Sequence, residues 1–167
     1  VDACVRVMGV AGIERAHVIG HSMGTIVATH LAVSEPSMVK SLALFGPLLA
    51  PPDPARSALR TRGAKARDEG LQGMHTIAET LAAASISTSN RTRKPVALAY
   101  VRESLMRQDP EGYARSCEAL ADAQPADVSM LDCPVLLVTG DEDAVAPAQS
   151  VRMMTDKFKQ ARMEVLR

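Results

Sequence analysis

Residues 20–24 read Gly20-His21-Ser22-Met23-Gly24, a G-x-S-x-G pentapeptide between a strand-like run and a helix-like run. The run before it, residues 16–19, is short and largely apolar, with β-branched side chains. The run after it extends from residue 23 to residue 34, and Glu35-Pro36 ends it. This context predicts a nucleophile elbow, with Ser22 on a tight turn between a strand and a helix. The alternative is a chance turn, because Gly and Ser are common residues.

Such an elbow places demands on the neighbours of its serine. The backbone two residues before the serine comes close to the backbone two residues after it, so we expect glycine to be required at both Gly20 and Gly24. The N–H groups at the start of the helix point toward a reacting carbonyl group. The backbone amide of Met23 is therefore the expected oxyanion donor.

A second signal is the stretch Cys133-Pro134-Val135-Leu136-Leu137-Val138-Thr139-Gly140-Asp141-Glu142-Asp143-Ala144-Val145-Ala146-Pro147. Its continuous apolar run predicts a parallel strand that is buried on both faces, and ligand-facing residues follow the carboxyl ends of such strands. Asp143 has this place and is the predicted catalytic acid. The alternative is a carboxylate that only caps a turn or a helix.

With both motifs, the chain resembles the α/β-hydrolase family, in which a serine elbow is followed by an acid after a later strand. Gly140, Asp143 and Pro147 match the family's G-x-x-D-x-x-x-P setting. The resemblance implies that Ser22 is the nucleophile, that Asp143 orients the base and that the Met23 amide is one oxyanion donor. Within the family, residues 109–120 and the Pro-Val-Leu-Leu-Val strand are similar to the 3-oxoadipate enol-lactonase group.

The family's base is a histidine after one more strand, but no histidine follows Asp143 in this sequence. The four histidines are His17, His21, His30 and His75, and we expect structural or surface roles for them. Replacement of the missing base by His75 is an open alternative. We therefore expect an internal fragment of an α/β-hydrolase, nearly inactive as it stands, with the histidine and the second oxyanion donor outside it.

Strand-like segments near residues 15–20, 39–45, 134–139 and 162–167 alternate with helical segments as βαβ units do. They predict a partial α/β-hydrolase fold of about four parallel strands with flanking helices and a helical cap insertion. The cap's expected helices are residues 54–69, 71–87, 94–108 and 110–123. The predicted domains are 1–47, the elbow half of the core; 48–125, the cap; and 126–167, the acid-bearing strand, a helix and the last strand.

The first half of the predicted cap is rich in basic side chains. Solvated helix faces are the ordinary explanation of such a run. The alternative is that one arginine grips a substrate carboxylate through two hydrogen bonds. The basic residues are Arg56, Arg60, Arg62, Lys65, Arg67, Arg91, Arg93 and Lys94.

Composition argues against several other classes. The 19 basic and 19 acidic side chains give zero net charge, and only 2% of the residues are aromatic, so we expect no nucleic-acid partner. No run approaches the roughly 20 apolar residues of a membrane span, so we expect no membrane partner and a cytoplasmic location by default. Cys4, Cys117 and Cys133 have no metal-binding spacing and are expected to be buried thiols.

The expected function is hydrolysis of carboxylic esters or lactones through an acyl-enzyme on Ser22, with a small-molecule substrate and with no metal or organic cofactor. The same triad supports C–C bond hydrolysis and cofactor-free perhydrolysis, which stay open as alternatives. A different alternative is a non-catalytic hydrolase-like protein, in which Ser22 is only a turn residue.

Overall fold

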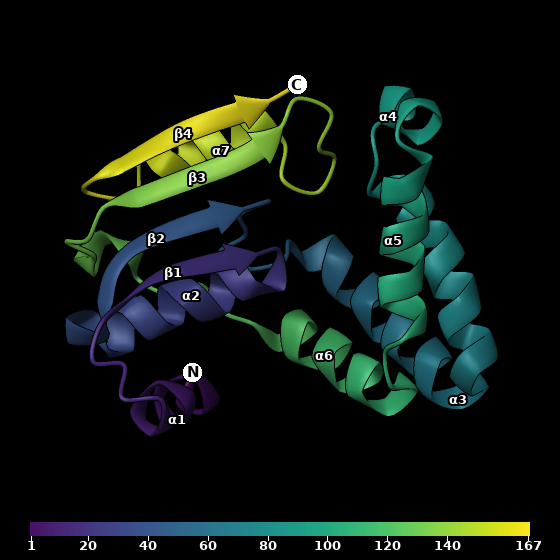
Figure 1. The fold of residues 1–167 in the computed structure, drawn as a ribbon, viewed down its shortest axis with the longest axis horizontal. Helices are drawn as coiled ribbons and strands as arrows, with labels where there is room; N and C mark the ends of the chain where they lie inside the picture. Colours follow the sequence, from purple (N-terminus) through teal and green to yellow (C-terminus); the bar gives the residue numbers. More distant parts are fainter. The chain divides into compact units, whose positions relative to one another are not determined.

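The computed structural model describes residues 1–167 and divides into two compact units, which we describe separately (Figure 1). The sheet unit comprises Val1–Ala50 and Gln124–Arg167. The helical unit is Pro51–Ala123. No helix is long and apolar enough to cross a membrane.

The sheet unit is built on four parallel strands in the order β1-β2-β3-β4. This arrangement confirms the predicted α/β class and the four predicted strands. The elements in chain order are α1 (Asp2–Val10), β1 (Ala16–His21), α2 (Met23–Ser34), the 3₁₀ turn η1 (Pro36–Met38), β2 (Val39–Phe45), η2 (Val128–Met130), β3 (Val135–Gly140), α7 (Ala148–Thr155) and β4 (Ala161–Leu166).

The two central strands carry the core of the sheet unit. Leu44 of β2 is in register with Leu137 of β3, and neither side chain has measurable exposure. Helix α2 packs against β1 and β2, whereas α7 packs against β3 and β4 and buries Val151 completely. Strand β1 lies at one edge of the sheet, where Ile19 is 74% exposed. Strand β3 has a nearly continuous apolar pattern, as expected for a strand that is buried on both faces, whereas β2 includes the exposed Lys40.

The helical unit contains α3 (Asp53–Ala84), α4 (Thr88–Arg93), α5 (Pro95–Met106) and α6 (Pro110–Asp122). Helix α3 consists of two arms that meet at Gly70, whose φ of 56° and ψ of −129° are not helical. This break confirms the predicted division at residue 70. The sequence pattern predicts no helix between residues 87 and 94, where the structure has the short helix α4.

The two arms of α3 fold back against each other, as Figure 1 shows. A Cβ atom added to Gly73 would lie 2.4 Å from the carbonyl oxygen of Lys65, eight residues earlier in the chain. In a straight helix these positions are about 12 Å apart, so the contact requires the reversal at Gly70. The two arms and α6 enclose a small core in which Met74, Ala66 and Ala114 are fully buried.

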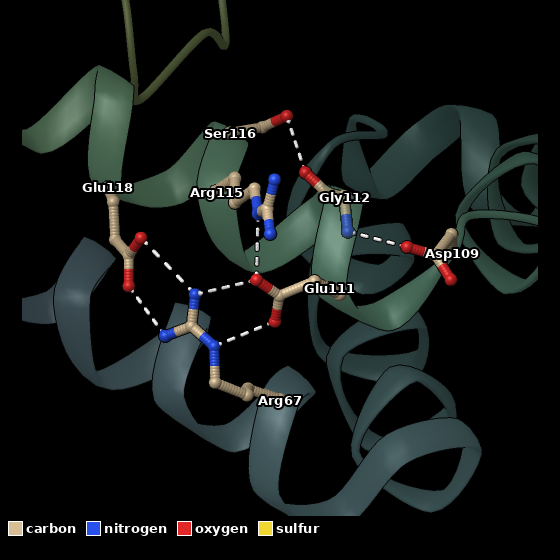
Figure 2. A network of polar contacts seen from close by, with 7 residues as sticks. All are labelled: Arg67, Asp109, Glu111, Gly112, Arg115, Ser116 and Glu118. Carbon is tan, nitrogen blue, oxygen red and sulfur yellow. Dashed lines mark hydrogen bonds and ion pairs between the residues drawn. The ribbon is translucent and has the colours of Figure 1, made fainter.

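A network of ion pairs links α3 to α6 (Figure 2). The Arg67 guanidinium donates to Glu111 at 2.8 Å and to Glu118 at 2.6 Å, and Arg115 donates to Glu111 at 2.8 Å. Hydrogen bonds, first from Arg67 and then from Arg115, lower the pKa of Glu111 to about 2. These side chains are exposed, so the network orients the two helices while each pair adds little stability.

Candidate active site

Ser22 lies between β1 and α2, as the pentapeptide predicts. Its φ of 50° and ψ of −120° make it the only residue other than glycine with a positive φ in the chain. This conformation costs about 1–3 kcal/mol and persists only where the surroundings enforce it. The Ser22 N–H donates to the carbonyl oxygen of Phe45 at 3.0 Å, which ties the turn to the end of β2. The strained geometry is that of a nucleophile elbow.

The two glycines of the elbow have different roles. A Cβ atom on Gly20 would lie 2.5 Å from the carbonyl oxygen of Gly24 and 2.9 Å from the backbone nitrogen of Thr25. A Cβ atom on Gly24 would meet nothing within 4 Å. The prediction that both positions require glycine is therefore wrong for Gly24. The Cα of Gly20 lies against the Gly24 backbone, whereas a side chain on Gly24 would point into open space.

Thr25 holds the elbow from within α2. Its side chain is fully buried, and its hydroxyl oxygen lies 2.6 Å from the carbonyl oxygen of Ser22 and 3.0 Å from that of Leu48. The same hydroxyl accepts a hydrogen bond from the Leu48 N–H at 2.9 Å. Thr25 thus joins the serine turn to the loop after β2. This role of Thr25 is not visible in the sequence, because threonine within a helix carries no signal of a partner 23 residues away.

Met23 is the first residue of α2, so its N–H has no partner inside the helix. This position suits an oxyanion donor, because the positive end of the helix dipole lies there. The role of the Met23 amide as an oxyanion donor stays a prediction.

Asp143 lies in the turn after β3. Its Oδ1 accepts hydrogen bonds from the N–H groups of Val145 and Ala146, each at 2.8 Å. The buried hydroxyl of Thr139 lies 3.4 Å from Oδ2 but bonds more closely to the carbonyl oxygen of Ala146, at 2.6 Å. One carboxylate oxygen is therefore engaged in holding the turn, while Oδ2 has a single long contact. This geometry fits both a turn cap and an acid that holds a base.

Ser22 and Asp143 follow strands that flank β2 on its two sides. His21 of β1 is in register with Phe45 of β2, and Phe45 is in register with Val138 of β3. Neighbouring strands lie about 4.8 Å apart, so the two turns flank the carboxyl end of β2. Gly46 lies between them: its N–H donates to Val138, and a Cβ atom on it would be 3.8 Å from Asp143 Oδ2.

Within the sheet unit, no hydrogen bond joins a histidine to Ser22 or Asp143. His17 Nδ1 pairs with Ser41 at 2.7 Å, and His30 Nε2 pairs with the carbonyl oxygen of Gln124 at 2.9 Å. His75 belongs to the helical unit, where Nε2 lies 3.4 Å from Arg102 and 3.7 Å from Glu79. His21 is exposed at the end of β1. The described side chains therefore include a candidate serine and a candidate acid but no base that bridges them.

The structure shows no cluster of three or more histidine, cysteine or acidic side chains that could hold a metal ion. The three cysteines are free thiols. Cys117 is buried, whereas Cys4 and Cys133 are only partly buried, so the expectation of buried thiols is confirmed for Cys117 alone. Burial raises the pKa of the Cys117 and Cys133 thiols, which makes both poor nucleophiles at neutral pH.

A family model described as serine aminopeptidase, S33 (Hydrolase_4) matches residues 6–166 of this chain. The chain is 26% identical over 162 residues to the (E)-2-((N-methylformamido)methylene)succinate hydrolase of Acinetobacter baylyi, a match that covers 95% of the chain and 59% of that protein. It is also 26% identical over 155 residues to 3-oxoadipate enol-lactonase 2 of the same organism, covering 92% of the chain and 56% of that protein.

Among solved structures, the enol-lactonase from Burkholderia xenovorans LB400 superimposes on the chain with a TM-score of 0.89 at 28% identity. This match covers 98% of the chain and 62% of the enol-lactonase. The chain thus spans between 56% and 62% of the length of these three relatives.

Proposed function

The chain belongs to the serine aminopeptidase S33 family of α/β-hydrolases, and from this membership we propose that the whole protein hydrolyses carboxylic esters or lactones through an acyl-enzyme on Ser22. The observation that carries the proposal is the positive φ of Ser22, the one strained residue other than glycine, at the strand-to-helix turn. Such strain is retained where the geometry is needed, and the elbow presents the serine hydroxyl to a substrate.

In the proposed reaction, Ser22 Oγ attacks the carbonyl carbon of the ester while its proton passes to a base. The Met23 N–H stabilises the negative charge that develops on the carbonyl oxygen. The base then protonates the leaving alcohol, and water releases the acid in a second step. For a lactone, the leaving alcohol stays attached to the acyl group, so one open-chain hydroxy or keto acid results.

Asp143 is proposed to orient the base and to stabilise its charged form. Its Oδ1 is fixed by two backbone N–H groups, which leaves Oδ2 available for such a partner. None of the histidines of the sheet unit, His17, His21 and His30, is hydrogen-bonded to Asp143 or Ser22, and we propose that the base is a residue outside residues 1–167.

We further propose that the helical unit, within predicted residues 48–125, acts as a cap that selects the substrate. Similarity to two enol-lactonases, one of them at 28% identity in a solved structure, supports a lactone as the substrate. A third relative is a hydrolase of a substituted succinate, which supports a substrate that carries a carboxylate.

The test is covalent labelling of the whole protein with a fluorophosphonate, together with hydrolysis of a p-nitrophenyl ester and of an enol-lactone. Ser22→Ala should abolish labelling and lower turnover by about 10⁶-fold. Asp143→Asn should lower turnover by about 10⁴-fold, because the amide can accept the same two N–H bonds but cannot balance a charged base. Asp141→Asn, in the same turn and exposed, is the matched control and should leave the rate unchanged.

Two results would contradict the proposal. If Ser22→Ala kept its label, the reactive nucleophile would be another residue. If the folded whole protein neither reacted with the fluorophosphonate nor hydrolysed either substrate, the non-catalytic alternative would hold, with Ser22 as a turn residue only.

A further inference from the structure

A groove runs between the two arms of α3, within the helical unit. It has a volume of about 520 Å³, which lies in the range of small-molecule sites. The first arm contributes Ser57, Ala58, Thr61 and Arg62, and the second contributes Ile77 and Leu81. The groove is formed by one helix and its reversal, so it exists independently of the elbow in the sheet unit.

Arg62 is the one basic residue of α3 that has no carboxylate partner. Arg56 pairs with Asp53, Arg60 with Asp122, Lys65 with Glu69 and Arg67 with Glu111 and Glu118. Lys65 also lines the groove, but its ammonium group lies 2.8 Å from both carboxylate oxygens of Glu69, so its charge is balanced. The groove therefore presents one positive charge that no acidic side chain compensates.

The neighbours of Arg62 leave that charge in place. Tyr113 of α6 shares a side-chain hydrogen bond with Arg62, and Cys117 of α6 lies close to it. Burial raises the pKa of the Tyr113 hydroxyl and of the Cys117 thiol, so both groups are neutral at pH 7. Arg62 itself is partly buried, where an arginine interacts with an anion more strongly than it does on an open surface.

The hydroxyl groups of the groove differ in what they can donate. Thr76 and Thr80 donate to carbonyl oxygens of their own helix, at 3.1 Å and 3.0 Å. Ser57 and Thr61, one turn apart on the first arm, make no such bond, so their protons are available to a ligand. Next to them, Ile77 is 4% exposed and Leu81 is half-buried, which supplies an apolar wall.

We propose that this groove binds a small amphiphilic monocarboxylate. The carboxylate pairs with the Arg62 guanidinium and accepts hydrogen bonds from Ser57 and Thr61, and the hydrocarbon part lies along Ile77 and Leu81. A single uncompensated positive charge matches a singly charged carboxylate better than a doubly charged phosphate. The proposal concerns binding alone and does not depend on hydrolysis at Ser22.

The test is a calorimetric titration of the 167-residue chain with octanoate. Octanol has the tail without the charge, acetate has the charge without the tail, and inorganic phosphate carries a larger charge. We expect saturable one-to-one binding of octanoate, and binding of each of the other three at least about tenfold weaker. Saturable binding of phosphate or acetate as tight as that of octanoate would overturn the proposal, as would the absence of saturable octanoate binding.

Two variants locate the site. Arg62→Gln should weaken octanoate binding about tenfold or more, because a charge-assisted pair is lost. Ala58→Leu adds bulk inside the groove and removes no polar contact, so it should also weaken binding about tenfold. Ala64→Leu makes the same change at an exposed position of the same helix outside the groove and should bind like the parent.

If circular dichroism shows that Arg62→Gln does not fold, the comparison of Ala58→Leu with Ala64→Leu tests the site instead. Equal octanoate affinity in these two variants would refute the site. Parent-like affinity in a folded Arg62→Gln variant would refute it as well.

Discussion

Replacing Gly20 with alanine would place a methyl group against the backbone on the other side of the elbow. The new Cβ atom would lie 2.5 Å from the carbonyl oxygen of Gly24, 2.8 Å from its carbonyl carbon and 2.9 Å from the nitrogen of Thr25. All three atoms are backbone, so they cannot move aside as a flexible side chain can. Relief requires a shift of about 1 Å in the chain that holds Ser22.

The cost follows from this geometry. Overpacking of a closed site costs about 1–3 kcal/mol, and we expect the upper part of that range because Ser22 is already strained and Thr25 ties the turn to Leu48. With a urea slope of about 2 kcal/mol/M, the unfolding midpoint should fall by about 1 M. The measurement is urea unfolding of the chain followed by circular dichroism.

Gly24→Ala is the matched control, four residues away in the same motif. Its Cβ atom would meet nothing within 4 Å, and alanine is favoured over glycine in a helix by about 0.5–1 kcal/mol. Its midpoint should therefore stay the same or rise by up to about 0.5 M of urea. Equal losses in the two variants, or a stable Gly20→Ala variant, would refute the reasoning that only one side of the elbow is closed.

Three further predictions concern other contacts. Gly73→Ala should destabilise the chain by about 1–3 kcal/mol in a thermal melt, despite the better helix propensity of alanine, because the Cβ atom would meet the backbone of Lys65 at 2.4 Å. Its control is Gly9→Ala, in open space in α1, which should be neutral or stabilising in the same measurement. Thr25→Val should cost about 1–3 kcal/mol in urea unfolding because the partly buried N–H of Leu48 loses its acceptor. Thr25→Ser should retain most of the stability, so similar losses in the two variants would contradict a role of the hydroxyl group. The pKa of Glu111 falls from its ordinary 4.5 to about 2 in the folded state, so its ion pairs contribute stability above pH 4.5 that is lost as the pH falls from 4.5 to 2. Glu111→Gln should therefore make the free energy of unfolding less dependent on pH in that window. If the variant and the parent lost stability equally with acid, the network would not contribute as argued.

The arrangement of the helical unit bears on how these tests are interpreted. The Arg67 network joins α3 to α6 through exposed side chains, and Ala114 of α6 is also fully buried in one core with Ala66 and Met74 of α3. Acid should therefore loosen the ion pairs between α3 and α6 while these buried contacts persist.

The sequence by itself determined the parts of this protein that depend on short-range preferences. The apolar run of residues 135–138 identified β3, since a strand that is buried on both faces is largely apolar. The pentapeptide around Ser22 identified the elbow, and Gly70 marked the break in α3. In each case the signal lies within a few residues of the feature it predicts.

Only the tertiary structure decided which of these residues carry a contact. It showed that Gly20 closes the elbow while Gly24 has open space, that Thr25 holds Leu48, and that Arg62 alone on α3 lacks a carboxylate partner. Each of these facts depends on atoms that the folded chain brings together in space. Thr25 and Leu48 are 23 residues apart, and local sequence preference carries no information about a hydrogen bond over that separation.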